Sequence, residues 1–349
     1  MIAVRKVRVL VVDDSALVRR LARETLQSDE GIEVVGVATD PYEAQKRMDE
    51  LAPDVITLDL EMPRMDGLTF LRLLMANRPI PVIVMSSLTA RGSDFAFEAL
   101  RLGAVDVIGK PQGTYSFGAI GDELIAKVKA AAGARIDRRS PLSGAEGLLK
   151  STGRRAAASA NTRSLILLGA STGGIEALSQ IMTALPGDLP GIAIVQHLPA
   201  LFSKGFAKRL AALSAVEVKE AEDGDVLHSG RALLAPGDRH LLLRWSGAHY
   251  VARLSDGPAL WHQRPAVDLL FRSAAEAGAG AGCVAGVLTG MGRDGADGLK
   301  RLRDTGARTF AQDEATSVVY GMPRAARENG GAQAEFPLTA IAAHLVRSA

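Results

Sequence analysis

Short runs of apolar, mostly β-branched residues alternate with stretches of helical spacing along the first part of the chain, and this alternation restricts the possible folds. Strands that are apolar throughout are typical of parallel sheets, which are buried on both faces. The pattern therefore predicts an α/β domain with a five-stranded, doubly wound parallel sheet over residues 1–132. Its apolar runs cover residues 7–12, 32–37, 55–58, 82–85 and 105–108, and its helical stretches cover residues 16–26, 41–51, 67–75, 93–102 and 117–131.

The alternation stops at residue 133 and resumes after residue 163. Residues 133–163 are rich in Gly, Ser, Ala and Arg, with seven Lys or Arg against two acidic residues, which is typical of a flexible basic linker. Short strands with intervening turns over residues 216–250 suggest an antiparallel piece. We expect a second, larger and mostly parallel α/β domain over residues 164–349, with that antiparallel addition. Its other apolar runs cover residues 165–168, 192–195, 284–288 and 308–310.

Composition argues against several classes of protein. Aromatic residues make up 4% of the chain, too few for a surface that stacks nucleic-acid bases. Basic and acidic residues balance over residues 164–349, so we expect no nucleic-acid binding. The single cysteine, Cys283, lies in an apolar run and is expected to be buried. The N-terminus does not read as a signal peptide, and no apolar run reaches the roughly twenty residues of a membrane span. We expect a cytoplasmic monomer with no membrane insertion.

Polar side chains follow four of the strands expected in the first domain. Asp13 and Asp14 close the first strand, Asp59 the third, Ser86 the fourth and Lys110 the fifth. The carboxyl ends of parallel strands meet at one edge of a sheet, where three carboxylates repel one another unless a cation such as Mg²⁺ lies among them. The set suits a phosphoryl group carried on Asp59. Asp14 as a mere helix cap, and Lys110-Pro111 as a mere helix stop, are the structural alternatives.

Residues 7–130 resemble a response-regulator receiver domain, most specifically in the segment Asp59-Leu-Glu-Met-Pro-Arg-Met-Asp-Gly67. The resemblance implies phosphorylation of Asp59 by a histidine kinase, with Mg²⁺ bound by the three aspartates and the phosphoryl group sensed by Ser86 and Lys110. Val107 departs from the family, because many receivers carry an aromatic switch residue there. We therefore expect no aromatic rotamer switch.

The segment Gly169-Ala-Ser-Thr-Gly173 directly follows an apolar run in the second domain. It matches the G-x-S-x-G pattern, in which a serine lies on a sharp turn between a strand and a helix. Glycine-rich turns before helices also bind phosphate, but this one lacks the Gly-Lys-Ser/Thr ending of a P-loop. The pattern favours Ser171 as a nucleophile.

Two residues just past other strand ends complete a possible catalytic set. His197 follows the apolar run at residues 192–195, and Asp294 follows the run at 284–288. Parallel strands bring such positions to the edge where Ser171 is expected, which predicts a Ser171–His197–Asp294 triad. Backbone amides at residues 172–174 or 290–292 are candidates for the oxyanion hole. His344 as the base, Asp297 as the acid, and His197 as a core histidine are the alternatives.

Residues 164–349 resemble the catalytic domain of chemotaxis protein-glutamate methylesterases. The resemblance rests on three motifs: Gly-Ala-Ser-Thr-Gly-Gly, Val195-Gln-His-Leu-Pro199 and Leu288-Thr-Gly-Met-Gly-Arg-Asp-Gly-Ala296. It implies that Ser171 is the nucleophile, His197 the base and Asp294 the orienting acid, with the Met291 amide in the oxyanion hole. From the serine turn itself, the Thr172 amide is our second candidate for the oxyanion hole. The resemblance also implies hydrolysis of glutamyl methyl esters on chemoreceptor helices, deamidation of receptor glutamines, and a receiver that covers the active site until it is phosphorylated.

Three other interpretations stay open at this point. A methylesterase of this family could serve a pathway other than chemotaxis. A receiver could instead control a non-catalytic binding or DNA-binding output, although no basic recognition helix is evident. The basic linker could also act as an arm that guides the enzyme to acidic receptor helices.

Overall fold

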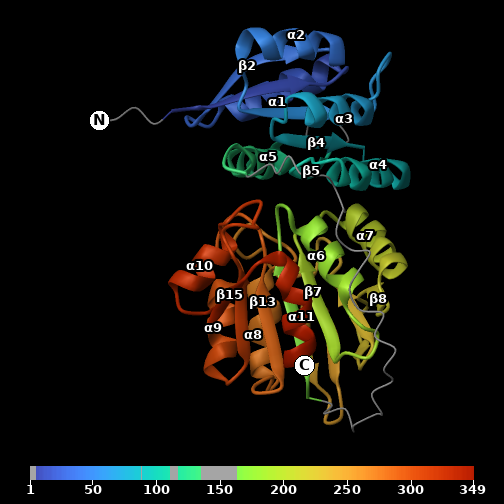
Figure 1. Cartoon of the computed structure of the whole chain (residues 1–349), viewed down its shortest axis with the longest axis vertical. Coiled ribbons are helices and arrows are strands. Elements are labelled where there is room, and N and C mark those ends of the chain that lie inside the picture. Colours follow the sequence, from blue (N-terminus) through green and yellow to red (C-terminus); the bar gives the residue numbers. More distant parts are fainter. Residues whose placement is uncertain (1–4, 88, 111–116, 135–162) are drawn as a thin grey trace. The chain divides into compact units, whose positions relative to one another are not determined.

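The computed structural model describes residues 5–87, 89–110, 117–134 and 163–349 (Figure 1). Contacts divide the chain into two compact units, Met1–Pro141 and Leu142–Ala349, and each is described by itself. Most of the linker expected at residues 133–163 lies outside the described residues, and so does Pro111. The domain boundaries proposed from the sequence therefore stay predictions.

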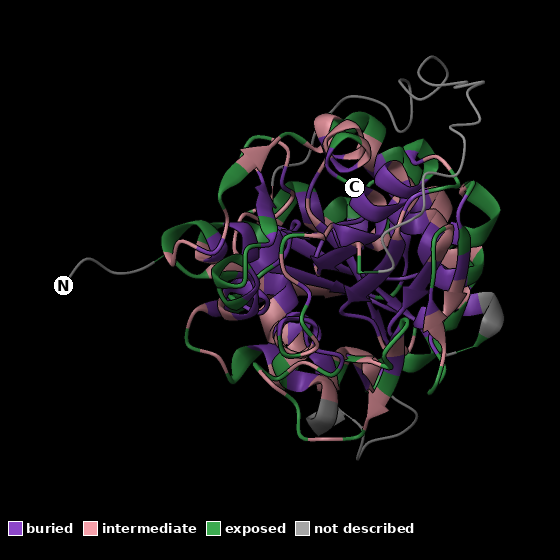
Figure 2. Ribbon diagram, turned by 90° about the horizontal axis from the view of Figure 1, so that it is seen from below, coloured by how far each residue is buried: buried purple, intermediate pink, exposed green. Residues whose placement is uncertain are grey.

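The first unit is the expected five-stranded parallel sheet, in the order β2-β1-β3-β4-β5. Strands β3, β4 and β5 are buried at every position, whereas the edge strand β2 is buried only in part, and this burial explains why the strands read as apolar runs. Figure 2 colours the helices and strands of the chain by burial, with buried residues in purple. The strands are β1 (Val7–Val12), β2 (Ile32–Ala38), β3 (Val55–Asp59), β4 (Val82–Ser86) and β5 (Asp106–Gly109). The helices are α1 (Ala16–Gln27), α2 (Pro41–Leu51), α3 (Gly67–Asn77), α4 (Ala90–Arg101) and α5 (Phe117–Ala132).

Polar side chains at the N-caps begin four of these helices. Asp40 accepts hydrogen bonds from two amides of α2, Asp66 accepts one from Thr69, and Thr89 accepts one from Gly92. The Thr89 cap starts α4 three residues before the stretch expected from spacing alone. Ser15, not Asp14, caps α1, so the interpretation of Asp14 as a helix cap is wrong.

The second unit contains a seven-stranded parallel sheet in the order β15-β14-β13-β6-β7-β10-β8 and a three-stranded antiparallel sheet in the order β11-β12-β9. The parallel strands are β6 (Leu165–Ala170), β7 (Gly191–Gln196), β8 (Glu217–Glu220), β10 (Arg231–Leu234), β13 (Cys283–Val287), β14 (Arg308–Gln312) and β15 (Ala334–Phe336). The antiparallel strands are β9 (Val226–Leu227), β11 (His240–Trp245) and β12 (Tyr250–Ser255).

One part of the sequence prediction for residues 216–250 is wrong. The sequence pattern predicts an antiparallel piece over that region, but β8 and β10 pair in parallel with the main sheet, whereas β9 and β11 pair with β12 in the antiparallel sheet. Strands of two to six residues carry too little pattern to show which sheet they enter.

Helices cover both faces of the large sheet. Helices α6 (Gly174–Ala184), α7 (Ala200–Leu213) and α11 (Leu338–Ser348) form one packed group, and α8 (Val267–Glu276), α9 (Ala296–Asp304) and α10 (Met322–Glu328) form another. Alternate residues of β6, β7 and β13 share a core with α8, α9 and the antiparallel sheet. Cys283 lies in this core, which confirms the prediction that it is buried, and burial raises the pKa of its thiol to about 12. Within the described residues, the structure contains no helix long and apolar enough to cross a bilayer.

Candidate functional site

The three residues of the predicted triad follow three neighbouring strands. Strand β6 lies between β13 and β7 in the sheet. Ser171 follows β6, His197 follows β7, and Asp294 lies in the loop after β13. The sheet pairing continues into the loops: the Ser171 amide donates to the Thr289 carbonyl at 3.0 Å, and the His197 amide donates to the Ala170 carbonyl at 3.2 Å. All strands of this sheet are parallel, but the order of strand addition reverses at β6: β7, β10 and β8 lie on one side of it, and β13, β14 and β15 lie on the other. The carboxyl end of β6 is therefore a topological switch point.

Ser171 lies on a tight turn between β6 and α6. Gly173 has φ of 79°, a left-handed conformation that glycine adopts without strain, and the Gly174 amide donates to the Ser171 carbonyl at 2.7 Å. The buried Gln196 side chain supports the turn through a 2.9 Å hydrogen bond from Nε2 to the same carbonyl. Ser171 is half-buried, and its hydroxyl makes no hydrogen bond to any described residue.

His197 and Asp294 form a buried pair. His197 Nε2 lies 2.8 Å from Asp294 Oδ2, and the two residues are 8% and 2% exposed. The Asp294 carboxylate also accepts the first two amides of α8, from Val267 at 2.7 Å and from Asp268 at 2.9 Å. Helix α8 receives no side-chain cap from its own N-cap residue, Ala266, so Asp294 takes this role.

This pairing decides how the imidazole faces the serine. Because Asp294 occupies Nε2, Nδ1 is the nitrogen left for a proton from Ser171. No hydrogen bond joins Ser171 and His197 among the described residues, and such contacts often tighten only when substrate binds.

The alternatives for base and acid lie elsewhere. His344 packs between Phe310 and Phe336, with ring centroids 5.3 Å and 4.2 Å away, and burial lowers its pKa. Asp297 forms an ion pair with Arg293 at 3.2 Å. The structure thus brings His197 and Asp294 into contact. His344 and Asp297 have other partners.

The loop after β13 lies against the serine turn. A Cβ atom on Gly290 would lie 2.7 Å from Ser171 Cβ, so only glycine permits this approach. The Gly290 carbonyl accepts the amides of Gly321 and Met322, which fixes the loop. The Met291 amide donates to no described protein group, and the Met291 side chain is exposed. The predicted oxyanion amide is therefore free to meet a substrate.

Thr289 is a supporting residue that sequence reasoning missed. Its buried hydroxyl donates to the Thr172 carbonyl at 2.9 Å and accepts the Val319 amide at 3.0 Å. It thereby connects the serine turn, which holds the buried Thr172, to residues 317–322. A lone polar residue at the end of an apolar strand was the only available signal.

The acids of the first unit also meet at one sheet edge. Oxygens of Asp13, Asp14 and Asp59 all lie within 4.8 Å of one another. Lys110 Nζ lies 2.8 Å from Asp13 Oδ2 and 2.7 Å from Asp59 Oδ2. Both buried oxygens contact the ammonium at ion-pair distance but accept no directed hydrogen bond. Oxygen donors with unused lone pairs fit a hard divalent cation.

Burial gives these groups unusual proton affinities. It raises the pKa of Asp59 to about 6; the nearby Asp13 carboxylate acts in the same direction, while Lys110 opposes it. Burial also disfavours the Lys110 cation, but attraction to Asp13 and Asp59 outweighs this and raises the Lys110 pKa.

Ser86 does not face the aspartates in this structure. Its hydroxyl donates to the Gly92 carbonyl in α4 at 2.8 Å, whereas its own carbonyl accepts the Lys110 amide at 2.7 Å. Its role at a phosphoryl group stays a prediction. Val107 is fully buried in β5.

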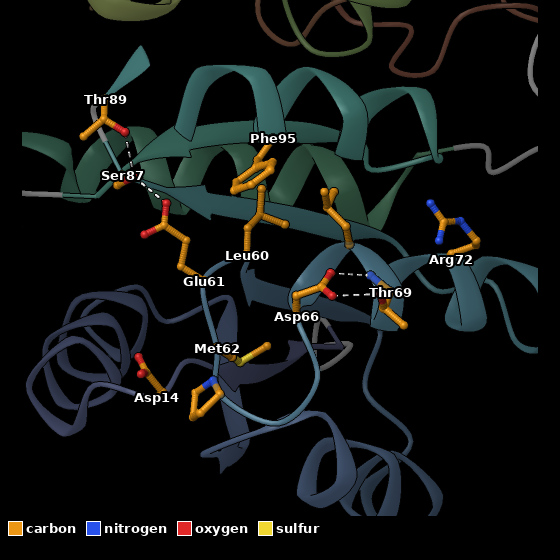
Figure 3. Close-up of a pocket in the computed structure, with 12 residues that line it drawn as sticks. Asp14, Leu60, Glu61, Met62, Asp66, Thr69, Arg72, Ser87, Thr89 and Phe95 are labelled. Atoms are coloured by element: carbon orange, nitrogen blue, oxygen red, sulfur yellow. Dashed lines mark hydrogen bonds between the residues drawn. The ribbon is translucent and has the colours of Figure 1, made fainter. Parts of the chain in front are cut away.

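A cavity of about 990 Å³ opens beside the acids, between the β3–α3 loop and the start of α4 (Figure 3). Glu61 lines it and was missed by sequence reasoning. The Glu61 amide donates to Asp59 Oδ1 at 3.0 Å. The Glu61 carboxylate accepts the Ser87 hydroxyl at 2.9 Å, a hydrogen bond that Figure 3 shows. Glu61 therefore connects the Asp59 loop to the loop that follows Ser86.

Comparisons with known proteins agree with both halves of this description. The family model described as CheB methylesterase matches residues 166–345, and that of the response regulator receiver domain matches residues 9–117. The chain belongs to the CheB methylesterase family. The two resemblances expected from the sequence are confirmed.

Full-length relatives combine the same two parts. A protein of Anaeromyxobacter dehalogenans named protein-glutamate methylesterase/protein-glutamine glutaminase 5 is 54% identical over 351 residues, which is 98% of this chain and 97% of the relative. A Rhodospirillum rubrum protein with the same name and the number 2 is 51% identical over 361 residues, covering 99% of both chains. The solved catalytic domain of Thermotoga maritima CheB methylesterase is 37% identical with a TM-score of 0.51, and the match covers 53% of this chain and 97% of that domain.

Proposed function

We propose that this protein hydrolyses glutamyl methyl esters on chemoreceptors to glutamate and methanol, deamidates receptor glutamines, and is activated by phosphorylation of Asp59. The relatives' names support the reaction class. The observation that carries the proposal is the buried His197–Asp294 pair, at 2.8 Å, beside the Ser171 turn. A buried, oriented imidazole next to a serine on a strand–helix turn suits acyl transfer.

In the proposed mechanism, His197 takes the proton of the Ser171 hydroxyl through Nδ1, and Ser171 Oγ attacks the ester carbonyl. Asp294 holds Nε2 and stabilises the imidazolium that forms. The proton then passes from His197 to the leaving methoxide, which departs as methanol and leaves an acyl-enzyme. Water, deprotonated by His197, hydrolyses the acyl-enzyme and restores Ser171. With a glutamine substrate, ammonia leaves in place of methanol.

The oxyanion of each tetrahedral intermediate is proposed to bind the amides of Met291 and Thr172. Support comes from the unpaired Met291 amide and from the close approach of Gly290 to Ser171. Loss of one such donor costs about 3–4 kcal/mol of transition-state stabilisation in comparable enzymes.

The receiver is proposed to hold Mg²⁺ between Asp13, Asp14 and Asp59, which their mutual spacing within 4.8 Å supports. When bound, the cation would neutralise phosphoryl and carboxylate charge. Asp59 would accept the phosphoryl group, Lys110 would contact one of its oxygens, and the Ser86 hydroxyl would leave the Gly92 carbonyl to contact another.

The proposed partners follow from these two chemistries. A chemotaxis histidine kinase would supply the phosphoryl group, and the cytoplasmic helices of methylated chemoreceptors would supply the ester, which places the reaction in the cytoplasm. The unphosphorylated receiver is proposed to repress the esterase. A bias of about 1.4 kcal/mol toward the repressed state gives roughly tenfold repression.

The test is methanol release from methylated receptor with and without a small-molecule phosphodonor and Mg²⁺. The parent should release methanol faster with the phosphodonor, and Ser171→Ala should release none. A parent that releases no methanol although Asp59 is phosphorylated would contradict the proposed substrate.

A further inference from the structure

Two arginines stacked on aromatic rings lie close to the Met291 amide. Arg293 follows Met291 by two residues, and its guanidinium carbon lies 4.8 Å from the centroid of the Trp261 ring. Tyr320 forms an isolated bridge with Gly290, the residue before Met291, and the Arg324 guanidinium carbon lies 5.5 Å from the centroid of the Tyr320 ring. The mechanism described above uses none of these four side chains.

The Trp261 platform is held rigidly. Trp261 Nε1 donates to Asp268 Oδ2 at 2.8 Å, and Asp268 is fully buried. The Asp268 amide in turn donates to Asp294 Oδ1 at 2.9 Å. Trp261 nevertheless remains 39% exposed. Trp261 thus presents a surface to solvent from a position fixed relative to the catalytic acid.

Arg293 has hydrogen-bond donors that no described residue uses. Its Nη2 contacts the Asp297 carboxylate at 3.2 Å, but Nε and Nη1 donate to no described residue, and 53% of the side chain is exposed. A guanidinium held over an aromatic ring loses less freedom when it binds a carboxylate, because its plane is already fixed.

Arg324 lacks an acidic partner altogether within the described part of the chain, and it is exposed. Its supporting ring is fixed at the other end, since the Tyr320 hydroxyl donates to the Glu335 carboxylate. In the same loop as Arg293, Met291 is 39% exposed, and no atom lies within 4 Å of a Cβ built on Gly292. We call Arg293 and Arg324 the rim: two exposed cations near an open stretch of the loop that carries the Met291 amide.

We propose that Arg293 and Arg324 are specificity-determining residues that bind carboxylates flanking the scissile ester on an acidic helical substrate. This inference rests on the proposed function. Ester hydrolysis and glutamine deamidation both produce glutamate, so a segment with several such positions becomes more anionic as it is processed. Paired cations around the loop complement that charge. Trp261 and Tyr320 position the two guanidinium groups.

The experiment compares Arg293→Gln and Arg324→Gln with the parent on a methylated receptor fragment and on p-nitrophenyl acetate, a small neutral ester. Arg301→Gln is the matched control, because the side chain of Arg301, on α9, is 54% exposed and forms an ion pair with Glu276 at the end of α8. Each rim variant should raise the KM for the receptor about fivefold, as expected for loss of one exposed charge contact, with a smaller change in kcat. The ratio of receptor to small-ester kcat/KM should fall by a similar factor. Added salt should reduce the difference in receptor KM between each rim variant and the parent, because salt screens the exposed charge contact.

Two outcomes would overturn the inference while leaving the proposed function intact. One is a receptor KM for both rim variants equal to that of Arg301→Gln. The other is an equal loss of kcat on both esters, which would show that the arginines only support the fold around Asp294. A parent that hydrolyses the small ester but not the receptor ester would instead contradict the proposed function, and this inference with it.

Discussion

Asp294 and Asp268 cap each other's helices: Asp294 accepts amides at the start of α8, which contains Asp268, and Asp268 accepts an amide at the start of α9, which follows Asp294. Asp294 Oδ1 accepts the Asp268 amide at 2.9 Å at the start of α8, and Asp268 Oδ1 accepts the Gly298 amide at 2.6 Å at the start of α9, which follows Asp294 in the chain. Burial raises the pKa of the Asp268 carboxyl, and hydrogen bonds from Trp261 and Gly298 offset part of this. The Asp294 carboxylate, proposed to orient His197, therefore also connects the starts of α8 and α9.

Asp294→Ala is expected to reduce both catalysis and stability. His197 loses its partner, so kcat should fall about a thousandfold or more, and the uncapped amides of Val267 and Asp268 should cost about 2–3 kcal/mol of unfolding free energy. Denaturant unfolding and ester hydrolysis measure the two effects. Ser171→Ala, whose hydroxyl makes no hydrogen bond to a described residue, should lose activity at parental stability. An Asp294→Ala protein as stable as the parent would contradict the capping role.

Gly290→Ala is expected to impair hydrolysis through crowding. The added Cβ would lie 2.7 Å from Ser171 Cβ and 2.4 Å from Met322 Sδ, so either the serine turn or the loop must move. A displacement of this kind in an active site can cost about a hundredfold in rate. Gly133→Ala is the control, because the nearest atom to its added Cβ is 3.8 Å away. Equal rates for both variants would show that the loop tolerates the shift.

Asp59→Asn is expected to stabilise the metal-free protein. The Asp59 pKa of about 6 exceeds its usual 3.8, so the unfolded chain ionises this group more readily and folding stability falls as pH rises between these values. Removing the charge should add about 2–3 kcal/mol above pH 6, and the gain should fade toward pH 4.

The check on Asp59→Asn is thermal unfolding in EDTA across this pH range, with and without excess Mg²⁺. Bound cation should reduce the advantage of the variant, since it stabilises the carboxylate of the parent. An advantage that persists at pH 4 would point to a cause other than ionisation.

Removal of divalent cations is expected to separate regulation from chemistry. EDTA should abolish the stimulation by phosphodonor, because phosphorylation is proposed to need Mg²⁺ at Asp13, Asp14 and Asp59, and it should leave the basal hydrolysis by Ser171 unchanged. Asp14→Asn should raise the Mg²⁺ concentration needed for half-maximal stimulation about tenfold, as expected for loss of one ligand charge. Asp49→Asn, at an exposed ion pair with Arg78, is the matched control. Stimulation that survives EDTA would contradict the Mg²⁺ assignment.

Position along the strands predicted much of this site. Ser171, His197 and Asp294 follow β6, β7 and β13, and strand ends in a parallel sheet converge whatever the intervening sequence. Two features were not predictable from the sequence: Asp294 contacts Nε2 of His197 and not Nδ1, and Asp294 caps α8. Both depend on the exact path of the loops between segments that are distant in the chain. Thr289 and Glu61 were missed for the same reason: their contacts are to segments brought near only by folding.

The short strands limited the fold prediction in a similar way. Residues 217–220 and 231–234 were assigned to the antiparallel piece, yet they form β8 and β10 of the parallel sheet. Four-residue strands show period and hydrophobicity but not direction, which the connections decide.

The most direct test of the account is methanol release from methylated receptor, measured with and without phosphodonor and Mg²⁺ for the parent, Ser171→Ala and Asp59→Ala. The account predicts stimulated release by the parent, none by Ser171→Ala, and basal release without stimulation by Asp59→Ala. Release by Ser171→Ala at the parental rate would contradict the catalytic assignment, and full stimulation of Asp59→Ala would contradict the switch.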